Sequence, residues 1–283
     1  MPKSEGPGRG DSEALSEAEI DAFRGQVLEH YRESGRDFPW RRTRDPWAIL
    51  VSEIMLQQTQ TDRVVPKYLA WMKAYPGPAA LASAPLAEVL GLWSGLGYNR
   101  RALALARAAS SIASIDGFPD DEDSLLELPG VGPYTARAVL AFAFDRPVVL
   151  IETNIRSVFL HRFFEGQEGV SDALLTPLIE ASMDRSDPRT WYYALMDYGA
   201  MLKKTLGNPN SRSAHYAKQS PFADSNRRIR GALLREIGSM GGADAEELAS
   251  TLPFARERVD KALAELQAEG FVAESCGIYR LGN

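Results

Sequence analysis

The sequence lacks several features that would each point to a particular class of protein. Cys276 is the single cysteine in 283 residues, which excludes an intramolecular disulfide framework and any cluster ligated by cysteines of this chain alone. No apolar run reaches the roughly 18 residues that span a bilayer, so we expect no membrane association. Residues 1–15 have no apolar core like that of a secretory signal, and we expect them to form a disordered leader.

An excess of positive charge is also missing. The chain carries 32 lysines and arginines against 38 aspartates and glutamates, which gives a formal net charge of −6. Domains that bind nucleic acid electrostatically usually present a basic surface. Nucleic-acid binding by this chain would therefore have to come from local patches.

Apolar residues that recur at helical spacing predict a mostly helical chain. Ser16 and Glu19 have the spacing of a capping box at the start of a first helix. Helices are expected over residues 17–32, 46–59, 62–74, 78–83, 86–92, 100–115, 122–126, 134–144, 155–164, 171–183 and 189–202. Residues 38–42 are expected to be extended, and residues 203–221 to form a polar, basic loop or linker.

The C-terminal part has a different pattern. Helices are expected over 224–240, 244–252 and 255–269, and residues 271–281 alternate around a Cys-Gly turn like a β-hairpin. We therefore predict an all-α protein with a small winged-helix-like domain, helices plus a β-hairpin, at residues 222–283. The helix at 255–269 carries both signs of charge, so DNA reading and partner binding both stay open for it. Better candidates for phosphate contacts are Arg227, Arg228 and Arg230.

Residues 128–154 combine a glycine-rich turn with an isolated acid. Gly130 and Gly132 allow a tight turn and a close approach to a ligand, because neither has a Cβ. Backbone N–H groups at the start of the following helix can bind a phosphate, although a simple turn is the alternative. Glu152 follows that helix, two residues before Asn154. The combination predicts a grip on a nucleic-acid backbone close to a site of chemistry.

Three motifs together resemble the helix-hairpin-helix DNA glycosylases, above all the MutY-type adenine glycosylases. They are SEIMLQQTQ at 52–60, GLGY at 95–98 and LPGVG at 128–132, within a resemblance that covers residues 38–202. It implies two helical lobes with a cleft that receives a nucleotide flipped out of duplex DNA. We expect one lobe, a six-helix barrel with the helix-hairpin-helix at about 122–144, over residues 37–165, and a second lobe over 16–36 and 166–221.

Two carboxylates in different environments can together cleave an N-glycosidic bond. One protonates the departing base, and the other faces a sugar with oxocarbenium character. Glu53, on an apolar helix, is a candidate for a raised pKa and for the proton donor, and Glu152 for the second role. The resemblance implies the same assignments, with Asn154 as the polar partner of Glu152. Structural alternatives are an acid at a helix edge for Glu53, and for Glu152 a loop acid that caps Asn154 or pairs with Arg156.

Three positions depart from the family's pattern. Glu152 stands where the family usually has Asp, and a misplacement near 1 Å can cost roughly a hundredfold in rate. Tyr134 stands where bifunctional relatives carry a Schiff-base lysine, so we predict little or no AP-lyase activity. Tyr134 could contact the flipped base or simply belong to the core. Asn99 replaces an aromatic residue that intercalates beside oxidised guanine, so the resemblance does not assign the target base.

The cysteine ligands of the family's iron–sulfur cluster are missing, so we predict no cluster and no other metal site. The resemblance allows only a monovalent cation, held by carbonyls of the helix-hairpin-helix. Hydrogen bonds are expected to hold the loop that replaces the cluster, through Asn208, Asn210, Arg212, His215 and Tyr216.

Residues expected to contact DNA are Gln57, Gln58, Tyr98, Asn99, Arg100, Gly130, Val131, Gly132 and Thr135. Gln57 and Gln58 are candidates for filling the space left by the flipped base and probing the opposite base. Further DNA contacts or, alternatively, solvated charges are Arg101, Lys203, Lys204, Arg212 and Lys218.

The sequence thus predicts a monofunctional DNA glycosylase of base-excision repair. It would act as a monomer on duplex DNA with a damaged or mispaired base, in the cytoplasm or on the nucleoid of a bacterium. The C-terminal domain leaves room for a protein partner. The alternative is a non-catalytic DNA-binding protein built on the same fold: Glu152 in place of Asp favours it, and Glu53 favours the enzyme.

Overall fold

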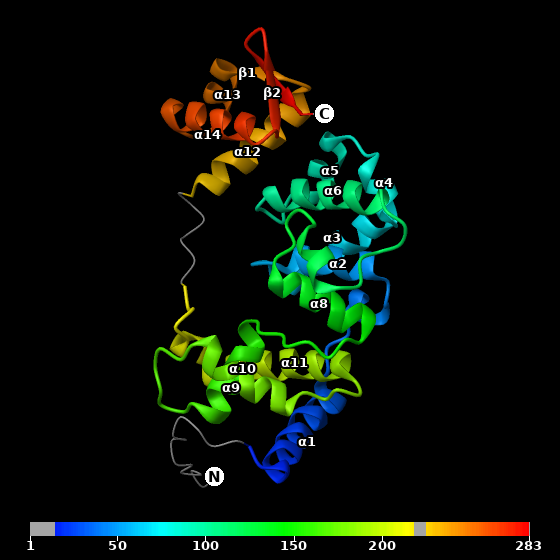
Figure 1. Cartoon of the computed structure of the whole chain (residues 1–283). Helices are drawn as coiled ribbons and strands as arrows, with labels where there is room; N and C mark the ends of the chain where they lie inside the picture. The colour runs from blue at the N-terminus through cyan, green and yellow to red at the C-terminus, as the bar shows by residue number, and fades with distance from the viewer. Residues whose placement is uncertain (1–14, 218–224, 283) are drawn as a thin grey trace. The chain divides into compact units, whose positions relative to one another are not determined.

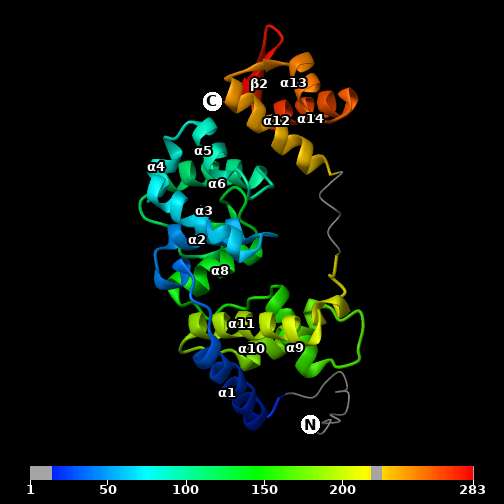
Figure 2. The same cartoon turned by 180° about the vertical axis from the view of Figure 1, so that it is seen from behind.

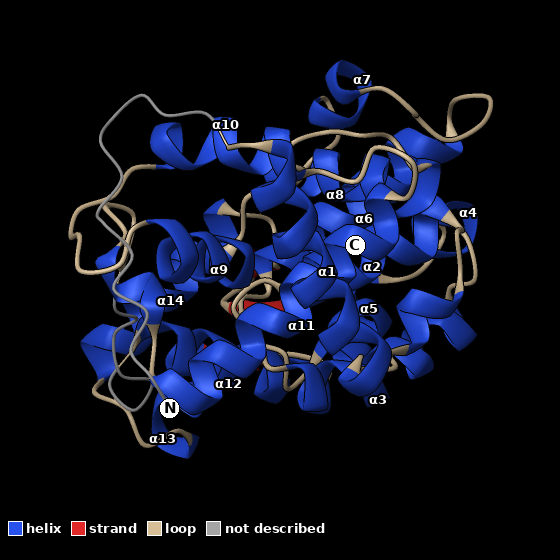
Figure 3. Cartoon of the chain, turned by 90° about the horizontal axis from the view of Figure 1, so that it is seen from below, coloured by secondary structure: helices blue, strands red, loops and turns tan. Residues whose placement is uncertain are grey.

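The computed structural model describes residues 15–217 and 225–282. Helices dominate these residues, and the strands are few and short (Figure 3). Residues 1–14 of the expected leader, 218–221 of the expected loop and 222–224 of the expected C-terminal domain lie outside the described residues. Within the described residues, no helix is both long and apolar enough to cross a membrane.

The helices confirm the predicted fold class. They are α1 (Glu17–Ser34), α2 (Pro46–Leu56), α3 (Thr61–Ala74), α4 (Pro78–Ala82), α5 (Leu86–Trp93), α6 (Arg100–Ala113), α7 (Glu122–Leu126), α8 (Pro133–Phe144), α9 (Thr153–Phe163), α10 (Asp172–Ser182), α11 (Pro188–Leu206), α12 (Asn226–Met240), α13 (Ala245–Thr251) and α14 (Arg256–Ala268). Two 3₁₀ helices, η1 (Pro39–Arg42) and η2 (Pro209–Arg212), complete the helical elements of the described residues.

The chain forms two compact units. The first contains Met1–Pro46, Asp120–Glu122 and Gly132–Lys218, and the second contains Trp47–Pro119, Asp123–Val131 and Gln219–Asn283. The expected lobes divide the chain at other residues, and that division stays a prediction.

The first unit is built on α1, α9, α10 and α11, which lie side by side in both views (Figures 1 and 2). Phe23 of α1 meets Phe159 and Phe163 of α9 and Trp191 of α11 edge-to-face, with ring centroids 5.4–5.7 Å apart. The capping box at Ser16, with both of its hydrogen bonds, starts α1 as predicted. These contacts make α9 and α11 a rigid base for the residues that they carry.

The second unit contains residues 47–56 of the apolar helix α2. All nine residues from Trp47 to Met55 are buried. Trp71 of α3 packs edge-to-face against Tyr75 and against Trp93 of α5. The indole of Trp47 donates to the Tyr75 carbonyl at 3.1 Å. Because these nine residues are buried, a polar side chain among them lies in a largely apolar environment.

The C-terminal part has the winged-helix-like plan. The helices α12, α13 and α14 pack with an antiparallel sheet of strand order β1-β3-β2 (Figure 1). The predicted hairpin is present as β2 (Val272–Ser275) and β3 (Ile278–Leu281). A third strand, β1 (Ala243–Asp244), was not predicted, and it pairs with β3 through Ala243 and Tyr279.

Two segments differ from the expected local structure. Residues 39–42 form the 3₁₀ helix η1 and are not extended, because Pro39 suits the first helical position. The helix α11 continues to Leu206, so Lys203 and Lys204 belong to its last turn and not to a loop. Basic side chains at a helix C-terminus are favourable there, because they face the negative end of the helix dipole.

Candidate active site

The first candidate residue, Glu53, lies inside α2. Its side chain is buried, with 6% of the residue exposed, among neighbours such as Leu50 and Ile54 that are fully buried. Burying a carboxyl group in apolar surroundings favours its protonated form over its charged form. Glu53 is therefore a buried acid inside the helix, and the structural alternative of an acid at a helix edge does not apply.

The end of α2 is held by a cation that the sequence did not reveal. The guanidinium of Arg101 donates to the carbonyls of Ile54, Met55 and Gln57 at 2.9, 3.2 and 2.5 Å. Its other terminal nitrogen reaches Thr59 and the carbonyls of residues 96 and 97. Burial lowers the pKa of Arg101 to about 10, so it remains charged at neutral pH. Arg101 is thus a structural cation that joins α2 to the loop before α6.

A helical pattern marks the buried face on which Arg101 lies. Leu105, Ala108 and Ile112 of α6 are buried, and they follow Arg101 by four, seven and eleven residues. A cation placed on the buried face of a helix needs carbonyl or carboxylate partners, because an unpaired buried charge is costly. This position was the available signal that Arg101 is not a surface charge.

The residues expected to probe the DNA follow α2 and precede α6. Gln57 is half-buried and Gln58 is exposed, in a left-handed backbone conformation with φ 53°. Tyr98 also has a positive φ, 48°, and two guanidinium groups lie near its ring, that of Arg101 at 5.4 Å and that of Arg227 at 4.9 Å from the centroid. Arg100 is largely exposed and binds Glu269 at 2.5 and 2.6 Å. Both loops therefore have a defined shape before any ligand binds.

The glycine-rich turn has the tight conformation that the sequence predicts. Gly130 has φ 81°, and a Cβ there would lie 2.7 Å from the Cβ of Ala104. The turn closes with a hydrogen bond from the Val131 N–H to the Leu128 carbonyl at 3.1 Å. Val131 and Thr135 are buried, so a DNA contact by either would come from its backbone. Gly132 is the N-cap of α8 and has no side chain to cap that helix.

The second candidate acid, Glu152, is the N-cap of α9. Its Oε1 accepts hydrogen bonds from the backbone N–H groups of Asn154 and Ile155 at 2.8 and 2.9 Å. Its Oε2 accepts one from the Asn154 side-chain amide at 3.2 Å, as expected for a polar partner. Burial raises the pKa of Glu152, and these hydrogen bonds and the charge of Arg156 oppose that rise. Arg156 itself binds Asp172, at 2.7 and 2.8 Å.

Two residues of α11 hold the segment around Glu152. The Tyr192 hydroxyl accepts from the Leu150 N–H at 3.1 Å and donates to the Val148 carbonyl at 2.7 Å. Gly199 lies against the first turn of α9, where a Cβ would be 2.2 Å from the Asn154 carbonyl oxygen. Only glycine permits this approach of α11 to α9. Neither residue belongs to the predicted site, and both position it.

Tyr134 lies in the first turn of α8 and is half-buried. Its side chain is neither a fully enclosed core residue nor a fully exposed one. An accessible phenol is compatible with a contact to a bound base, and it cannot form a Schiff base.

Comparison with known proteins identifies the family. The profile of the HhH-GPD superfamily base excision DNA repair proteins matches residues 51–224. The chain belongs to this superfamily. Its Glu53, its glycine-rich turn and Glu152 all lie within the matched region.

Relatives of the HhH-GPD chain include adenine and thymine glycosylases. It is 34% identical to an adenine DNA glycosylase of Mycolicibacterium smegmatis over 281 residues, 88% of this chain and 92% of the relative. It is 38% identical to a thymine-DNA glycosylase of Aeropyrum pernix over 181 residues, 62% of this chain and 76% of the relative. The human adenine DNA glycosylase is 34% identical over 247 residues, which are 82% of this chain but 44% of the human protein.

Solved structures show the same fold. The structure of a thermostable thymine-DNA glycosylase aligns with a TM-score of 0.58 and 28% identity, covering 64% of this chain and 86% of that one. A trapped covalent complex of endonuclease III with DNA aligns with a TM-score of 0.51 and 19% identity over 75% of this chain and 93% of that one, which shows the fold alone.

The segment that follows α11 lacks the cysteines of an iron–sulfur cluster, since Cys276 is the single cysteine of the chain. Arg212 holds it by donating to the carbonyls of Phe164 and Leu160 at 2.7 and 2.9 Å. Arg212 is therefore a structural cation as well. The backbone carbonyl of Asn208 accepts from Ser211, and the His215 ring accepts from the Asp172 N–H at 3.4 Å.

Not every expected bond of this segment is present. Asn210 is buried and accepts a long hydrogen bond from Arg156 at 3.4 Å. The side-chain oxygen of Asn208 is buried without a hydrogen-bond partner among the described residues. Tyr216 is 44% exposed, and its backbone N–H donates to the Ser213 carbonyl at 3.1 Å. Side-chain hydrogen bonds are thus present for Arg212, His215 and Asn210, and the described bonds of Asn208 and Tyr216 are made by their backbone atoms. No group of three or more potential metal-ligating side chains occurs within the described ranges 15–217 and 225–282.

Proposed function

We propose that the protein is a monofunctional DNA glycosylase, which removes a damaged or mispaired base from duplex DNA by hydrolysing its N-glycosidic bond. The observation that carries the proposal is Glu53, a carboxyl group enclosed in an apolar helix within the matched family region. The names of the relatives, adenine and thymine DNA glycosylases, support the same reaction class. We expect a monomer that works where the DNA is, in the cytoplasm or on a nucleoid.

In the proposed reaction, Glu53 donates its proton to the departing base. The bond between the base nitrogen and the anomeric carbon breaks, and the electron pair leaves with the base. The charged carboxylate of Glu152 stabilises the resulting oxocarbenium ion. A water molecule then forms the new bond to the anomeric carbon and releases a proton to the solvent. Glu53 takes a proton back from the solvent, so the reaction consumes no net proton.

The bonding of Glu152 supports its proposed role. Each carboxylate oxygen has two lone pairs, so the three hydrogen bonds it accepts leave capacity for interaction with a cation. These bonds also fix the carboxylate in one position. A fixed anion can stabilise developing positive charge without reorganising during the reaction. The longer side chain, compared with the Asp of the family pattern, is accommodated as a helix cap.

Tyr134 is the reason for proposing a monofunctional enzyme, which has no AP-lyase activity. A lyase of this superfamily type needs an amine to attack the sugar and form an imine, and a phenol has no such nitrogen. The product is therefore an intact strand with an abasic site. Tyr134 contacts the flipped base in this proposal.

A panel of DNA duplexes tests the proposed function and, in the same experiment, identifies the target base. Each duplex carries one mismatched, oxidised, deaminated or alkylated base and is incubated with the protein, with and without subsequent alkali. We expect strand breaks on at least one duplex that depend on the alkali treatment. Breaks without alkali, or efficient borohydride trapping on abasic DNA, would contradict the monofunctional assignment. Tight binding to a duplex with no base loss on any member would instead support a non-catalytic DNA-binding protein.

A further inference from the structure

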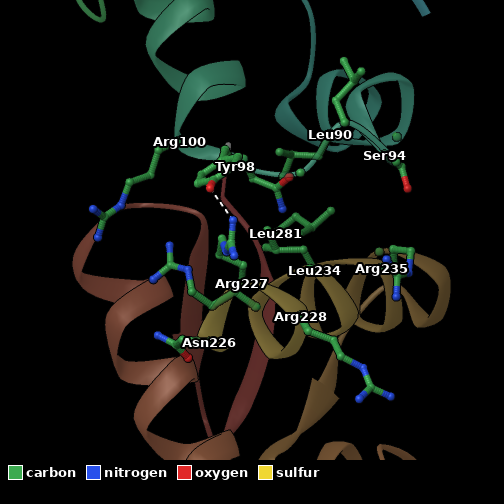
Figure 4. A pocket seen from close by; sticks show the side chains of 18 of the residues that line it. Leu90, Ser94, Tyr98, Arg100, Asn226, Arg227, Arg228, Leu234, Arg235 and Leu281 are labelled. Carbon is green, nitrogen blue, oxygen red and sulfur yellow. Dashed lines mark hydrogen bonds between the residues drawn. The ribbon is translucent and has the colours of Figure 1, made fainter. Parts of the chain in front are cut away.

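The second unit contains a groove lined with arginines, and neither candidate catalytic carboxylate contributes to it. The groove has a volume of about 1330 Å³ and lies between the loop of residues 94–100 and α12 (Figure 4). Its charged lining residues are Arg63, Arg100, Arg227, Arg228, Arg230, Arg235 and Glu265. Six arginines against one glutamate form a local positive patch on a chain whose net charge is −6.

Specific contacts fix the two walls of the groove to each other. Arg227 of α12 donates a hydrogen bond to the Tyr98 hydroxyl, which Figure 4 shows as a dashed line. Arg100 at the start of α6 and Arg230 of α12 both bind Glu269, at 2.6 and 2.8 Å. The hydrogen bonds from Arg100 and Arg230 lower the pKa of Glu269 to about 2, so it stays charged at neutral pH. The shape of the groove therefore exists before a ligand enters it.

One side of α12 faces the groove along its length. Arg227, Gly231 and Arg235 follow one another at intervals of four residues, so they share a face of the helix. Arg227 and Arg235 are separated by about 12 Å at the rise of an α-helix. One strand of B-DNA places a phosphate about every 3.4 Å along the duplex axis. A strand that follows α12 would thus pass several phosphates before these arginines.

Arg235 is the arginine best placed to receive a ligand. It is exposed, and among the described residues no hydrogen bond or ion pair occupies it. In contrast, Arg228 extends away from Tyr98 in Figure 4, and its guanidinium lies 5.3 Å from the Phe254 ring. Open space remains beside Arg235, because a Cβ on Gly231 would meet only the Arg235 guanidinium, at 3.9 Å.

We propose that this groove binds the phosphate backbone of one strand of duplex DNA, so that the winged-helix-like part extends the DNA-binding surface. The choice of DNA as the ligand rests on the proposed function. It is supported by continuity, because Gln58 and Tyr98, which are expected to contact DNA, also line the groove. An acidic peptide could satisfy the same arginines, and the experiment includes it.

Salt-dependent binding of the full-length protein to an unmodified duplex of about 25 base pairs tests this proposal. The test variants are Arg235→Ala and Gly231→Glu, which places a negative charge in the open space. Arg256→Ala is the matched control, since Arg256 lies on α14 and pairs with Asp260 outside the groove. Far-ultraviolet circular dichroism establishes that each variant folds.

For Arg235→Ala, we expect the slope of log affinity against log salt to become shallower by about 1, which corresponds to one lost phosphate contact. Gly231→Glu should weaken binding further, and Arg256→Ala should match the wild type. Unchanged affinity and slope in both test variants would overturn the proposal. So would a polyglutamate peptide that binds in an Arg235-dependent manner while the duplex does not.

Base release by the same variants separates this proposal from the proposed function. If the wild type releases no base but Arg235→Ala still makes the salt slope shallower, the groove proposal stands and the glycosylase proposal fails. If Glu53-dependent base release occurs and the slope is unchanged in Arg235→Ala, the groove proposal alone fails.

Discussion

At the scale of single residues, Glu152 combines two roles that often belong to different side chains. It caps α9 through two backbone N–H groups, and it is the proposed partner of the cationic sugar. From the sequence, capping and catalysis were alternatives for this residue. The capping interaction is present, and it does not exclude catalysis, because it holds the carboxylate in place and favours its charged form.

The environment of Glu152 predicts a specific pH dependence of base release. Burial raises the pKa of this carboxyl group above its ordinary value of 4.5. Only the charged form stabilises the cation, so activity should fall on acidification with a midpoint above 4.5. Single-turnover base release measured across the acidic range checks this. A midpoint at or below the ordinary value would contradict the assignment.

The same shift predicts an effect on stability of known sign. An acid whose pKa is raised in the folded state holds its proton more tightly there than in the unfolded chain. The contribution of Glu152 to the free energy of unfolding therefore declines as the pH rises from 4.5 through the raised pKa. Denaturant unfolding measures the free energy of unfolding of the wild type and of Glu152→Gln. The difference between the two free energies should change with pH between 4.5 and the raised pKa, and it should be constant above that pKa. A constant difference throughout would contradict the raised pKa.

At the scale of elements, the glycine-rich turn offers a matched pair of substitutions. Gly130→Ala forces a side chain into a left-handed conformation, with its Cβ 2.7 Å from Ala104, and should lower the free energy of unfolding by roughly 1–3 kcal/mol. Gly132→Ala meets nothing within 4 Å and has an extended φ of −102°, so its cost should stay within about 1 kcal/mol.

DNA binding distinguishes a phosphate grip from a simple turn. The added methyl group of Gly132→Ala occupies the space beside the N-terminus of α8. If that N-terminus binds a phosphate, this variant should bind duplex DNA more weakly although it is stable. Denaturant unfolding and anisotropy with a duplex measure the two quantities. Equal DNA affinity of Gly132→Ala and the wild type would show that the turn has no such role.

The positions of the helices could be predicted from the sequence because burial imposes a periodic pattern on them. The helix α7 (Glu122–Leu126) has the predicted bounds, and α1 begins at the predicted capping box. The strand β1 could not be found in this way. It has two residues, follows Gly242, and exists because it pairs with Tyr279 and Ile278 far along the chain. A pairing between distant residues leaves no local pattern.

The candidate site was predictable to the extent that its residues belong to motifs. Glu53 and Glu152 were identified by their place in the chain, and their burial and capping add the physical setting. Gly199 and Arg101 were not identified, because their roles depend on contacts with α9 and with the end of α2. Their polar and steric partners are backbone atoms, which the sequence does not display.

At the scale of the whole molecule, we expect this member of the superfamily to fold without iron. The single cysteine cannot supply a four-cysteine ligand set, and Arg212 ties the corresponding segment to the carbonyls at the end of α9. The purified protein should be colourless, with no absorbance typical of an iron–sulfur cluster. Metal analysis should give no stoichiometric iron. One cluster per chain would contradict this prediction.

Glu53 is the proposed proton donor to the departing base. The most direct test of this role is the release of free base from the best duplex of the panel under single-turnover conditions, for the wild type, Glu53→Gln and the control Glu88→Gln. Glu88 is an exposed acid on α5 of the same unit. We predict that Glu53→Gln lowers the rate by a factor on the order of 10²–10⁴, while Glu88→Gln matches the wild type. A Glu53→Gln variant that releases base at the wild-type rate would contradict this role.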